Sequence, residues 1–388
     1  MTLAVGTEVS ATIALPRSRP VPPATAGPRT ADPRIAGVGT AVSGRPYSQQ
    51  ELLDLCGITD AKVRSVFANS AIQRRYLTIP DRVDGAFVDE SQGALLRKHK
   101  SVAVGMGARA VQAALADAGL SLTDVDYLCC VTSSGFATPG VSALLIRELA
   151  IDPGCHRLDV VGMGCNAGLN ALNATANWAK ANPGRVAVMV CTEACSAAYV
   201  IDSTMRTAVV NSLFGDGAAA IVLSAPAGGT IGVGESSARP ASGPRILSFA
   251  SSIITDAFDA MRYDWDDAQH KFSFFLDPDI PYVVGAHAGP LVDRLLTRAG
   301  LRRSDIAHWL VHSGGKKVID AVRVNLGLTR HDVRHTVGVL RDYGNLSSGS
   351  FLFSYERLLR EGVVRPGDYG VLMTMGPGST IETALVRW

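Results

Sequence analysis

The sequence lacks a long apolar run and an excess of charge of one sign. No uninterrupted apolar stretch in its 388 residues reaches the roughly 18 that a membrane-spanning helix needs. Lysine and arginine number 37 against 35 aspartates and glutamates, and this net charge of +2 argues against a nucleic-acid surface. With 47% apolar and 19% charged residues, the chain has the balance of a soluble globular protein built as one large domain or two fused ones.

The cysteines do not suggest a disulfide framework. There are seven, an odd number, scattered through a large chain that shows no secretory leader. This favours reduced thiols and a cytoplasmic location. Cys191 and Cys195 are spaced like metal ligands, but no second pair or nearby histidine completes a tetrahedral set. We therefore expect no bound metal.

Composition divides the chain into three parts. Residues 1–34 are proline-rich with little hydrophobic periodicity, which predicts a disordered N-terminal tail. The stretch 224–245 is rich in glycine, alanine, serine and proline, which predicts a surface loop connecting two halves. The expected halves are residues 35–235 and residues 236–388.

The two halves resemble each other in sequence. AGLSLTDVDYLCCV at 118–131 is similar to AGLRRSDIAHWLVH at 299–312, and each runs from a helical pattern into a strand. GRVAVMV at 184–190 is likewise similar to GDYGVLM at 367–373, at nearly the same offset along the chain. A repeat with so long a period indicates two related folding units that each alternate strands and helices.

The strand patterns predict an α/β fold with buried sheets. Segments 186–191, 218–223 and 370–374 are continuous apolar runs, which is typical of strands covered by helices on both faces. Two such units predict a five-layered α/β/α/β/α sandwich. Ligands of open α/β folds collect beyond the carboxyl ends of strands, so residues far apart in sequence converge there.

Three segments place reactive side chains at such strand ends. Cys165 lies in VGMGCNAG at 161–168, a strand-to-helix turn, where a helix N-terminus favours the thiolate. His312 follows the apolar run 306–311, and Asn345 lies in RDYGNLSSGS at 341–350, another turn that opens a helix. Together a thiolate, an imidazole and an amide predict an acyl-transfer site.

From about residue 35 to the C-terminus, the chain resembles the type III polyketide synthases of the thiolase-like superfamily, related to chalcone and stilbene synthases. Two further segments carry the resemblance, LFGDGAAA at 213–220 and GPGSTIET at 376–383. It implies a thiolase-like fold, Cys165 as acyl-accepting nucleophile, and His312 and Asn345 as its catalytic partners. It also implies a homodimer and no redox cofactor.

Three other segments resemble a bacterial subgroup of that family, the 3,5-dihydroxyphenylacetyl-CoA synthases of glycopeptide-antibiotic pathways. They are CTEACSAAY at 191–199, DAMRYDWD at 259–266 and HSGGKKVID at 312–320. The resemblance implies decarboxylative condensation of four malonyl-CoA-derived units on the cysteine, C8-to-C3 cyclisation and aromatisation. The product would feed dihydroxyphenylglycine synthesis, with accessory enzymes of the same pathway as partners.

The resemblance also implies how substrates are held. Phe214 and Phe274 correspond to the aromatic pair that gates the CoA tunnel, and we expect Ser133 and Ser347 to line the cavity with them. Thr138 stands where plant enzymes commonly carry a methionine that reaches across the dimer. Basic residues expected to bind the phosphates of CoA are Lys62, Arg64 and Lys317.

Other functions remain open at this point. A papain-like protease also orders its residues Cys, His, Asn, but its local cysteine signature is absent. Another type III product, or a priming ketosynthase that takes an acyl carrier protein and stops after one condensation, is a nearer alternative. A non-catalytic ketosynthase partner that only sets chain length normally lacks the nucleophile that Cys165 supplies.

Overall fold

A computed structural model describes residues 32–83, 86–198, 204–226 and 243–388. The tail predicted for 1–34 therefore lies outside the described residues up to residue 31. Of the loop predicted for 224–245, residues 227–242 lie outside the described residues. Residue 199, the last of the segment 191–199, lies outside them too.

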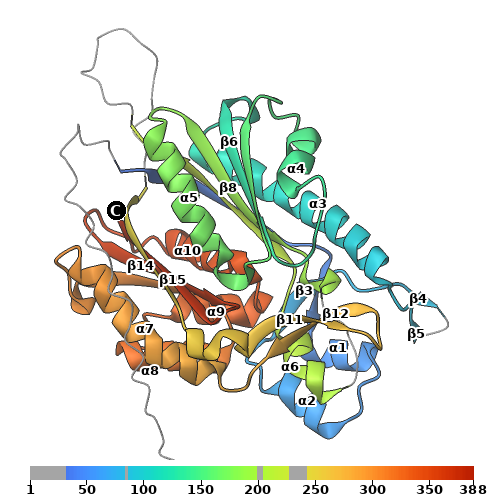
Figure 1. Cartoon of the computed structure of the whole chain (residues 1–388). Coiled ribbons are helices and arrows are strands. Elements are labelled where there is room, and N and C mark those ends of the chain that lie inside the picture. The colour runs from blue at the N-terminus through green and yellow to red at the C-terminus, as the bar shows by residue number, and fades with distance from the viewer. Residues whose placement is uncertain (1–31, 84–85, 199–203, 227–242) are drawn as a thin grey trace, which may run out of the picture.

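Nine strands form the main sheet system, five from the N-terminal half and four from the C-terminal half (Figure 1). The N-terminal strands lie in the order β1 (Arg34–Ala41), β9 (Gly217–Ser224), β8 (Val186–Glu193), β6 (Val125–Thr132) and β7 (His156–Val161). The C-terminal strands lie in the order β13 (Ile306–Val311), β14 (Tyr369–Gly376), β15 (Thr380–Arg387) and β10 (Arg245–Ile253). One pair, Arg34 with Arg245, joins the two sets.

The central strands are apolar along their whole length because helices cover both faces. In β8 and β14 every residue after the first is buried, as the continuous apolar runs predicted. The helices of the N-terminal half are α1 (Gln49–Leu55), α2 (Ala61–Ala68), α3 (Gln92–Ala118), α4 (Val141–Leu149), α5 (Ala167–Ala181) and α6 (Met205–Leu213). Those of the C-terminal half are α7 (Ile280–Thr297), α8 (Lys316–Leu326), α9 (Arg334–Tyr343) and α10 (Ser350–Glu361).

The helices and strands form five layers. Helices α3 and α4 pack on one face of the N-terminal strands, and α5 packs on the other (Figure 1). Helices α5 and α10 also contact β14 of the C-terminal set, so these two helices form the central layer. On the far side, α7 packs on β10 and β15, with α8 against it. The predicted α/β/α/β/α sandwich is confirmed.

The predicted duplication is visible in the elements. A 3₁₀ turn at Leu122–Asp124 leads into β6, and a matching turn at Arg303–Asp305 leads into β13. Helices α5 and α10 begin at the same separation along the chain as β8 and β14 do. The halves differ at β7, because within the described part of the chain α9 stands in the C-terminal half where a matching strand would be.

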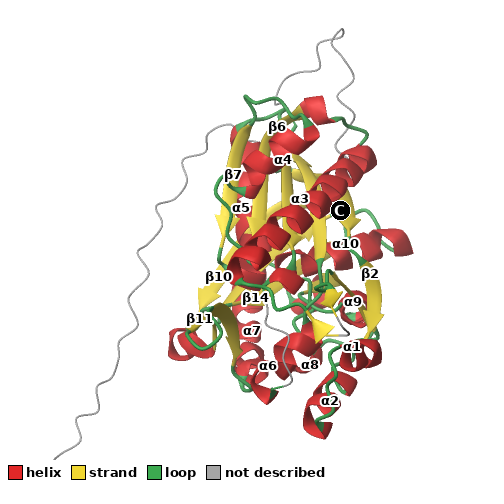
Figure 2. Ribbon diagram, turned by 90° about the vertical axis from the view of Figure 1, so that its right-hand side faces the viewer, coloured by secondary structure: helices red, strands yellow, loops and turns green. Residues whose placement is uncertain are grey.

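Smaller elements gather near one end of the sandwich. Helices α1, α2 and α6 lie together there, as both Figure 1 and Figure 2 show. Three antiparallel strand pairs lie outside the main sheet: β2 (Arg45–Ser48) with β3 (Arg74–Leu77), β4 (Arg82–Val83) with β5 (Ala86–Phe87), and β11 (Met261–Asp266) with β12 (Lys271–Leu276). The turns that precede α5 and α10 contact each other, which brings the two halves together at a single site.

Candidate active site

Cys165 lies on the turn between β7 and α5, as the sequence predicted. Two glycines with positive φ, Gly162 at 78° and Gly164 at 75°, reverse the chain before a short 3₁₀ turn that leads into the helix. A side chain at Gly164 would collide with the ring of Pro377, since its Cβ would lie 2.2 Å from Cδ. The backbone N–H of Gly164 donates to Ser133 Oγ at 2.8 Å. The thiol is therefore carried by a turn fixed on both sides.

The Cys165 thiol is buried and points toward the turn that precedes α10. Its Sγ lies 3.6 Å from Ser347 Oγ, and the Asn345 side chain also hydrogen-bonds to the thiol. Burial raises the pKa of Cys165 to about 12. The sequence predicted that the helix N-terminus would favour the thiolate, but here the loss of water around the sulfur outweighs that effect. The resting nucleophile is a thiol.

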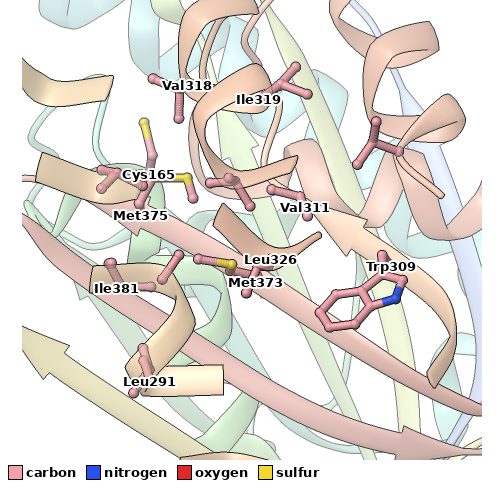
Figure 3. Packing of buried hydrophobic residues seen from close by; sticks show 14 of the residues in the cluster. Cys165, Leu291, Trp309, Val311, Val318, Ile319, Leu326, Met373, Met375 and Ile381 are labelled. Carbon is pink, nitrogen blue, oxygen red and sulfur yellow. The ribbon is translucent and has the colours of Figure 1, made fainter. Parts of the chain in front are cut away.

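Figure 3 shows the apolar surroundings of this thiol. The Cys165 side chain lies beside Met375 and Val318 in a buried cluster built mainly from the C-terminal half. The nucleophile of one half is thus packed against the core of the other half.

Asn345 is held so that its amide can donate. Its backbone N–H donates to the Leu213 carbonyl at 2.9 Å, and its own carbonyl accepts from the N–H of Gly215 at 3.0 Å. The side-chain Oδ1 accepts from the N–H of Ser347 at 2.8 Å. Because Oδ1 accepts a hydrogen bond in this way, the NH₂ group is the part of the side chain left to donate.

His312 follows β13 directly, as predicted, and its ring is buried. Its backbone N–H donates to the Met373 carbonyl at 2.8 Å. Burial lowers the pKa of His312 to about 3, so the imidazole is neutral at physiological pH. Its Nδ1 is buried without a hydrogen-bond partner among the described residues. This nitrogen therefore has room for a proton but is not exposed to the cavity.

The three predicted catalytic residues are connected in different ways, and neither Asn345 nor His312 is among the residues that line the cavity beside Cys165. Cys165 and Asn345 interact through their side chains. His312 is linked to the Asn345 turn by the hydroxyl of Ser313, which donates to the Gly344 carbonyl at 3.4 Å. The groups therefore come from three separate strand or turn ends, as the duplicated fold predicted.

A cavity of about 270 Å³ opens above the thiol. Four of the predicted substrate-binding residues line it: Ser133, Phe214, Phe274 and Ser347. The rings of Phe214 and Phe274 meet edge to face, with centroids 5.9 Å apart. The lining thus combines the cysteine with a pair of aromatic rings.

The other predicted contact residues lie outside this cavity. Thr138 is exposed on the loop after β6, so within a single chain it does not contact the cavity. Lys62 on α2 and Lys317 on α8 are exposed. Arg64 donates to the Ile58 carbonyl at 2.8 Å and lies 3.7 Å from Asp54, so its guanidinium is already engaged within the chain.

Sequence reasoning missed a second group of cavity residues on and before β11. Phe258, Met261 and Tyr263 line the cavity, and the Tyr263 ring lies 5.1 Å from that of Phe274. In the sequence, these residues were marked only by the segment 259–266, which resembles the bacterial subgroup but carries no pattern typical of a cavity wall. The β11–β12 hairpin forms one wall through both of its strands.

Glu193 is a further residue that the sequence did not single out. Its carboxylate is fully buried, and Oε2 accepts from the N–H groups of Ser133 and Ser134 at 2.9 and 3.0 Å. The Ser348 hydroxyl donates to Oε1. Burial raises the pKa of Glu193. This carboxylate ties the Ser133 loop to the turn of Ser348, and so holds two cavity walls together.

The described ranges contain neither a membrane-spanning helix nor a cluster of metal ligands. No helix there is both long and apolar enough to cross a membrane. No group of three or more His, Cys, Asp or Glu side chains within these ranges is arranged to hold a metal ion.

Comparison with known proteins gives matches over most of the chain. Residues 41–227 match the family described as "Chalcone and stilbene synthases, N-terminal domain", and residues 264–388 match its C-terminal domain. A 3,5-dihydroxyphenylacetyl-CoA synthase of Streptomyces toyocaensis is 68% identical over 375 residues, covering 96% of this chain and 92% of that protein. One of Amycolatopsis balhimycina is 67% identical over 356 residues, covering 92% and 93%.

Solved structures agree with these matches. The crystal structure of PKS-I from the brown alga Ectocarpus siliculosus has a TM-score of 0.83 and 26% identity, covering 92% of this chain and 99% of that one. The 1,3,6,8-tetrahydroxynaphthalene synthase of Streptomyces coelicolor, a bacterial type III polyketide synthase, has a TM-score of 0.80 and 27% identity at the same coverage.

Proposed function

The chain belongs to the chalcone and stilbene synthase family, and from this premise we propose that it is a type III polyketide synthase that makes 3,5-dihydroxyphenylacetyl-CoA. The relatives that are 67–68% identical carry that name. The observation that carries the proposal is Cys165 in the lining of a cavity of about 270 Å³, with the Asn345 amide against its thiol.

In the first step, Cys165 Sγ attacks the carbonyl carbon of an acyl-CoA thioester. The thiol proton passes to the neutral imidazole of His312, because both groups are uncharged at rest. The C–S bond to CoA breaks, and the CoA sulfur leaves as a thiol once it takes up a proton. The acyl group is then carried on Cys165.

In the second step, malonyl-CoA loses carbon dioxide and forms an enolate at its thioester. The Asn345 NH₂ and His312 donate hydrogen bonds to the enolate oxygen. Such fixed donors act on charge that exists only along the reaction path, and one of them typically contributes about 3 kcal/mol to the barrier. The enolate carbon then attacks the acyl carbon on Cys165, and the C–S bond to Cys165 breaks. The chain, two carbons longer and now a CoA thioester, is transferred back to Cys165 before the next extension.

Three extensions of an acetyl unit give an eight-carbon chain, and all of its carbons come from malonyl-CoA. Attack of the terminal methyl carbon on the third carbon closes a six-membered ring, and loss of water makes the ring aromatic. The first carbon keeps its CoA thioester. Each step is a substitution, a decarboxylation or a dehydration, so this scheme needs neither a redox cofactor nor a metal.

The substrate contacts and partners belong to the same proposal. Phe214, Phe274, Ser133 and Ser347 shape the chain as it grows, and Thr138 contributes from across a homodimer. The exposed Lys62 and Lys317 bind the CoA phosphates, and Arg64 joins them if its guanidinium leaves Ile58 and Asp54. We place the enzyme in the cytoplasm with accessory enzymes of its pathway. Sedimentation of the purified protein at twice the mass of the chain tests the dimer.

Incubation of the purified protein with malonyl-CoA alone tests the function directly. We expect 3,5-dihydroxyphenylacetyl-CoA, identified by mass and NMR, and no product from Cys165→Ala. An α-pyrone as the sole product would contradict the proposed cyclisation. A product that appears only with an acyl carrier protein, after one condensation, would favour the priming ketosynthase.

A further inference from the structure

A buried arginine lies behind the active site, outside the cavity itself. Arg75 is on β3, its side chain is 3% exposed, and no carboxylate of the described residues lies within ion-pair distance of it. Burial lowers the pKa of Arg75 to about 9, and the Asp216 carboxylate raises it only through space, because its oxygens accept from Thr78 and Ser196. Burying a cation without an ion-pair partner is costly. The position therefore calls for an explanation beyond packing.

The partners of Arg75 are backbone carbonyls at the end of α6. Its Nη1 donates to the Phe214 carbonyl at 2.6 Å, and Nη2 donates to the Asn211 carbonyl. Its Nε donates to Gln49 Oε1 at 3.2 Å, and Gln49 Nε2 in turn donates to the Ser212 carbonyl at 2.6 Å.

The remaining carbonyl of this turn belongs to Leu213 and accepts from the N–H of Asn345. The last carbonyls of a helix have no partner within the helix, and their negative end attracts a cation. Here Arg75, Gln49 and Asn345 satisfy all of the carbonyls from residue 211 to residue 214. The helix end, the gating phenylalanine and the active-site amide thus share one hydrogen-bonded unit.

The stem of Arg75 also packs behind the two glycines that flank this unit. Phe214 and Asn345 form an isolated parallel bridge, followed by Gly215 and preceded by Gly344. A Cβ built on Gly215 would lie 3.3 Å from Arg75 Cβ, and one on Gly344 would lie 3.4 Å from Arg75 Cδ. Backbone oxygens at 2.3 and 2.6 Å exclude larger residues at both positions. The arginine therefore lies directly against the bridge.

We propose that Arg75 is a positioning residue that fixes the Phe214 ring and the Asn345 amide relative to each other. This inference rests on the roles proposed above for those two residues. A planar guanidinium can bond two carbonyls at fixed separation, which a lysine ammonium does not reproduce. Without it, the end of α6 is free to shift, and both the cavity wall and the amide shift with it.

The test is Arg75→Met, studied with malonyl-CoA in two assays. We expect decarboxylation to fall by roughly 100-fold while acylation of Cys165 changes by less than about threefold, since small displacements of a positioned group have this effect. We also expect the ratio of aromatic product to shorter pyrones to fall, because the cavity wall has moved. A merely structural role would lower all rates together and leave the product ratio unchanged.

Three further variants make the outcome decisive. Arg74→Met, at the exposed neighbour on the same strand, should keep the original product ratio. Arg75→Lys should keep the fold but show the same shift in product ratio as Arg75→Met. If Arg75→Met does not fold, as judged by circular dichroism, Gln49→Leu removes one anchor of the unit and should shift the ratio in the same direction.

Asn345→Ala separates this inference from the proposed function. If Asn345→Ala keeps full decarboxylation, the mechanism proposed for the function fails at Asn345, whatever the result for Arg75. If it loses decarboxylation while folded Arg75→Met and Gln49→Leu keep both the rate and the product ratio, only the role of Arg75 is overturned.

Discussion

At the scale of single residues, burial sets the protonation of the two reacting groups. It raises the pKa of Cys165 to about 12 and lowers the pKa of His312 to about 3. A thiol and a neutral imidazole result, so the proton moves during the attack on the thioester. The pattern around Cys165 predicted a nucleophile from sequence alone, but its charge state depends on solvent exclusion, which only the assembled fold determines.

Asn345→Ala tests the amide donor. Its NH₂ group is the proposed donor, because Oδ1 accepts from the N–H of Ser347 and the side chain lies against the Cys165 thiol. We expect malonyl-CoA decarboxylation to slow by about 10²–10³-fold, the usual effect of removing one such donor. Carbon dioxide release measures this step, and Asn177→Ala, an exposed asparagine on α5, is the control. Unchanged carbon dioxide release would remove Asn345 from the mechanism.

At the scale of elements, the turn before α5 depends on two glycines that differ in their surroundings. In Gly162→Ala the added Cβ has no atom within 4 Å. The free energy of unfolding should therefore fall by about 1 kcal/mol, mainly because alanine is strained at a positive φ. Gly164→Ala adds a collision with Pro377, and overpacking of this kind costs about 1–3 kcal/mol more. Urea unfolding of both variants measures the difference in free energy of unfolding. Equal losses would show that the Pro377 contact does not constrain the turn.

Some elements of the site were predictable from sequence and others were not. The turns that carry Cys165 and Asn345 were predictable, because glycines and a strand-to-helix pattern mark both turns and the internal duplication relates them. Arg75 and Glu193 were not. Their partners are mostly backbone groups and hydroxyls from distant segments, and such partners leave no spacing pattern in the sequence. Met261 and Tyr263 belong to a hairpin whose placement over the cavity depends on tertiary packing.

At the scale of the whole molecule, the folded core buries the rings of His99 and His312. Burial lowers the pKa of His99 to about 4 and the pKa of His312 to about 3. The unfolded chain therefore binds these protons more readily below pH 6.5, and stability is lost as the pH falls from there toward 4. The raised pKa values of the buried Glu193 and Asp216 act in the opposite direction.

His99→Gln isolates one of these contributions. Between about pH 6 and pH 5, the free energy of unfolding of the unchanged protein should fall more steeply than that of the variant by about 1 kcal/mol per pH unit. Urea unfolding at both pH values gives the two slopes. Parallel slopes would mean that His99 is charged in the folded protein or is exposed to solvent.

The central claim is that Cys165 carries the growing chain while Asn345 and His312 act on the second substrate. Its most direct test is peptide mapping by mass spectrometry after incubation with isotope-labelled malonyl-CoA and rapid quenching. We expect the acyl label on the peptide that contains Cys165, more of it in Asn345→Ala, and none in Cys165→Ala. Label on a peptide without Cys165, or product formation by Cys165→Ala, would contradict the account.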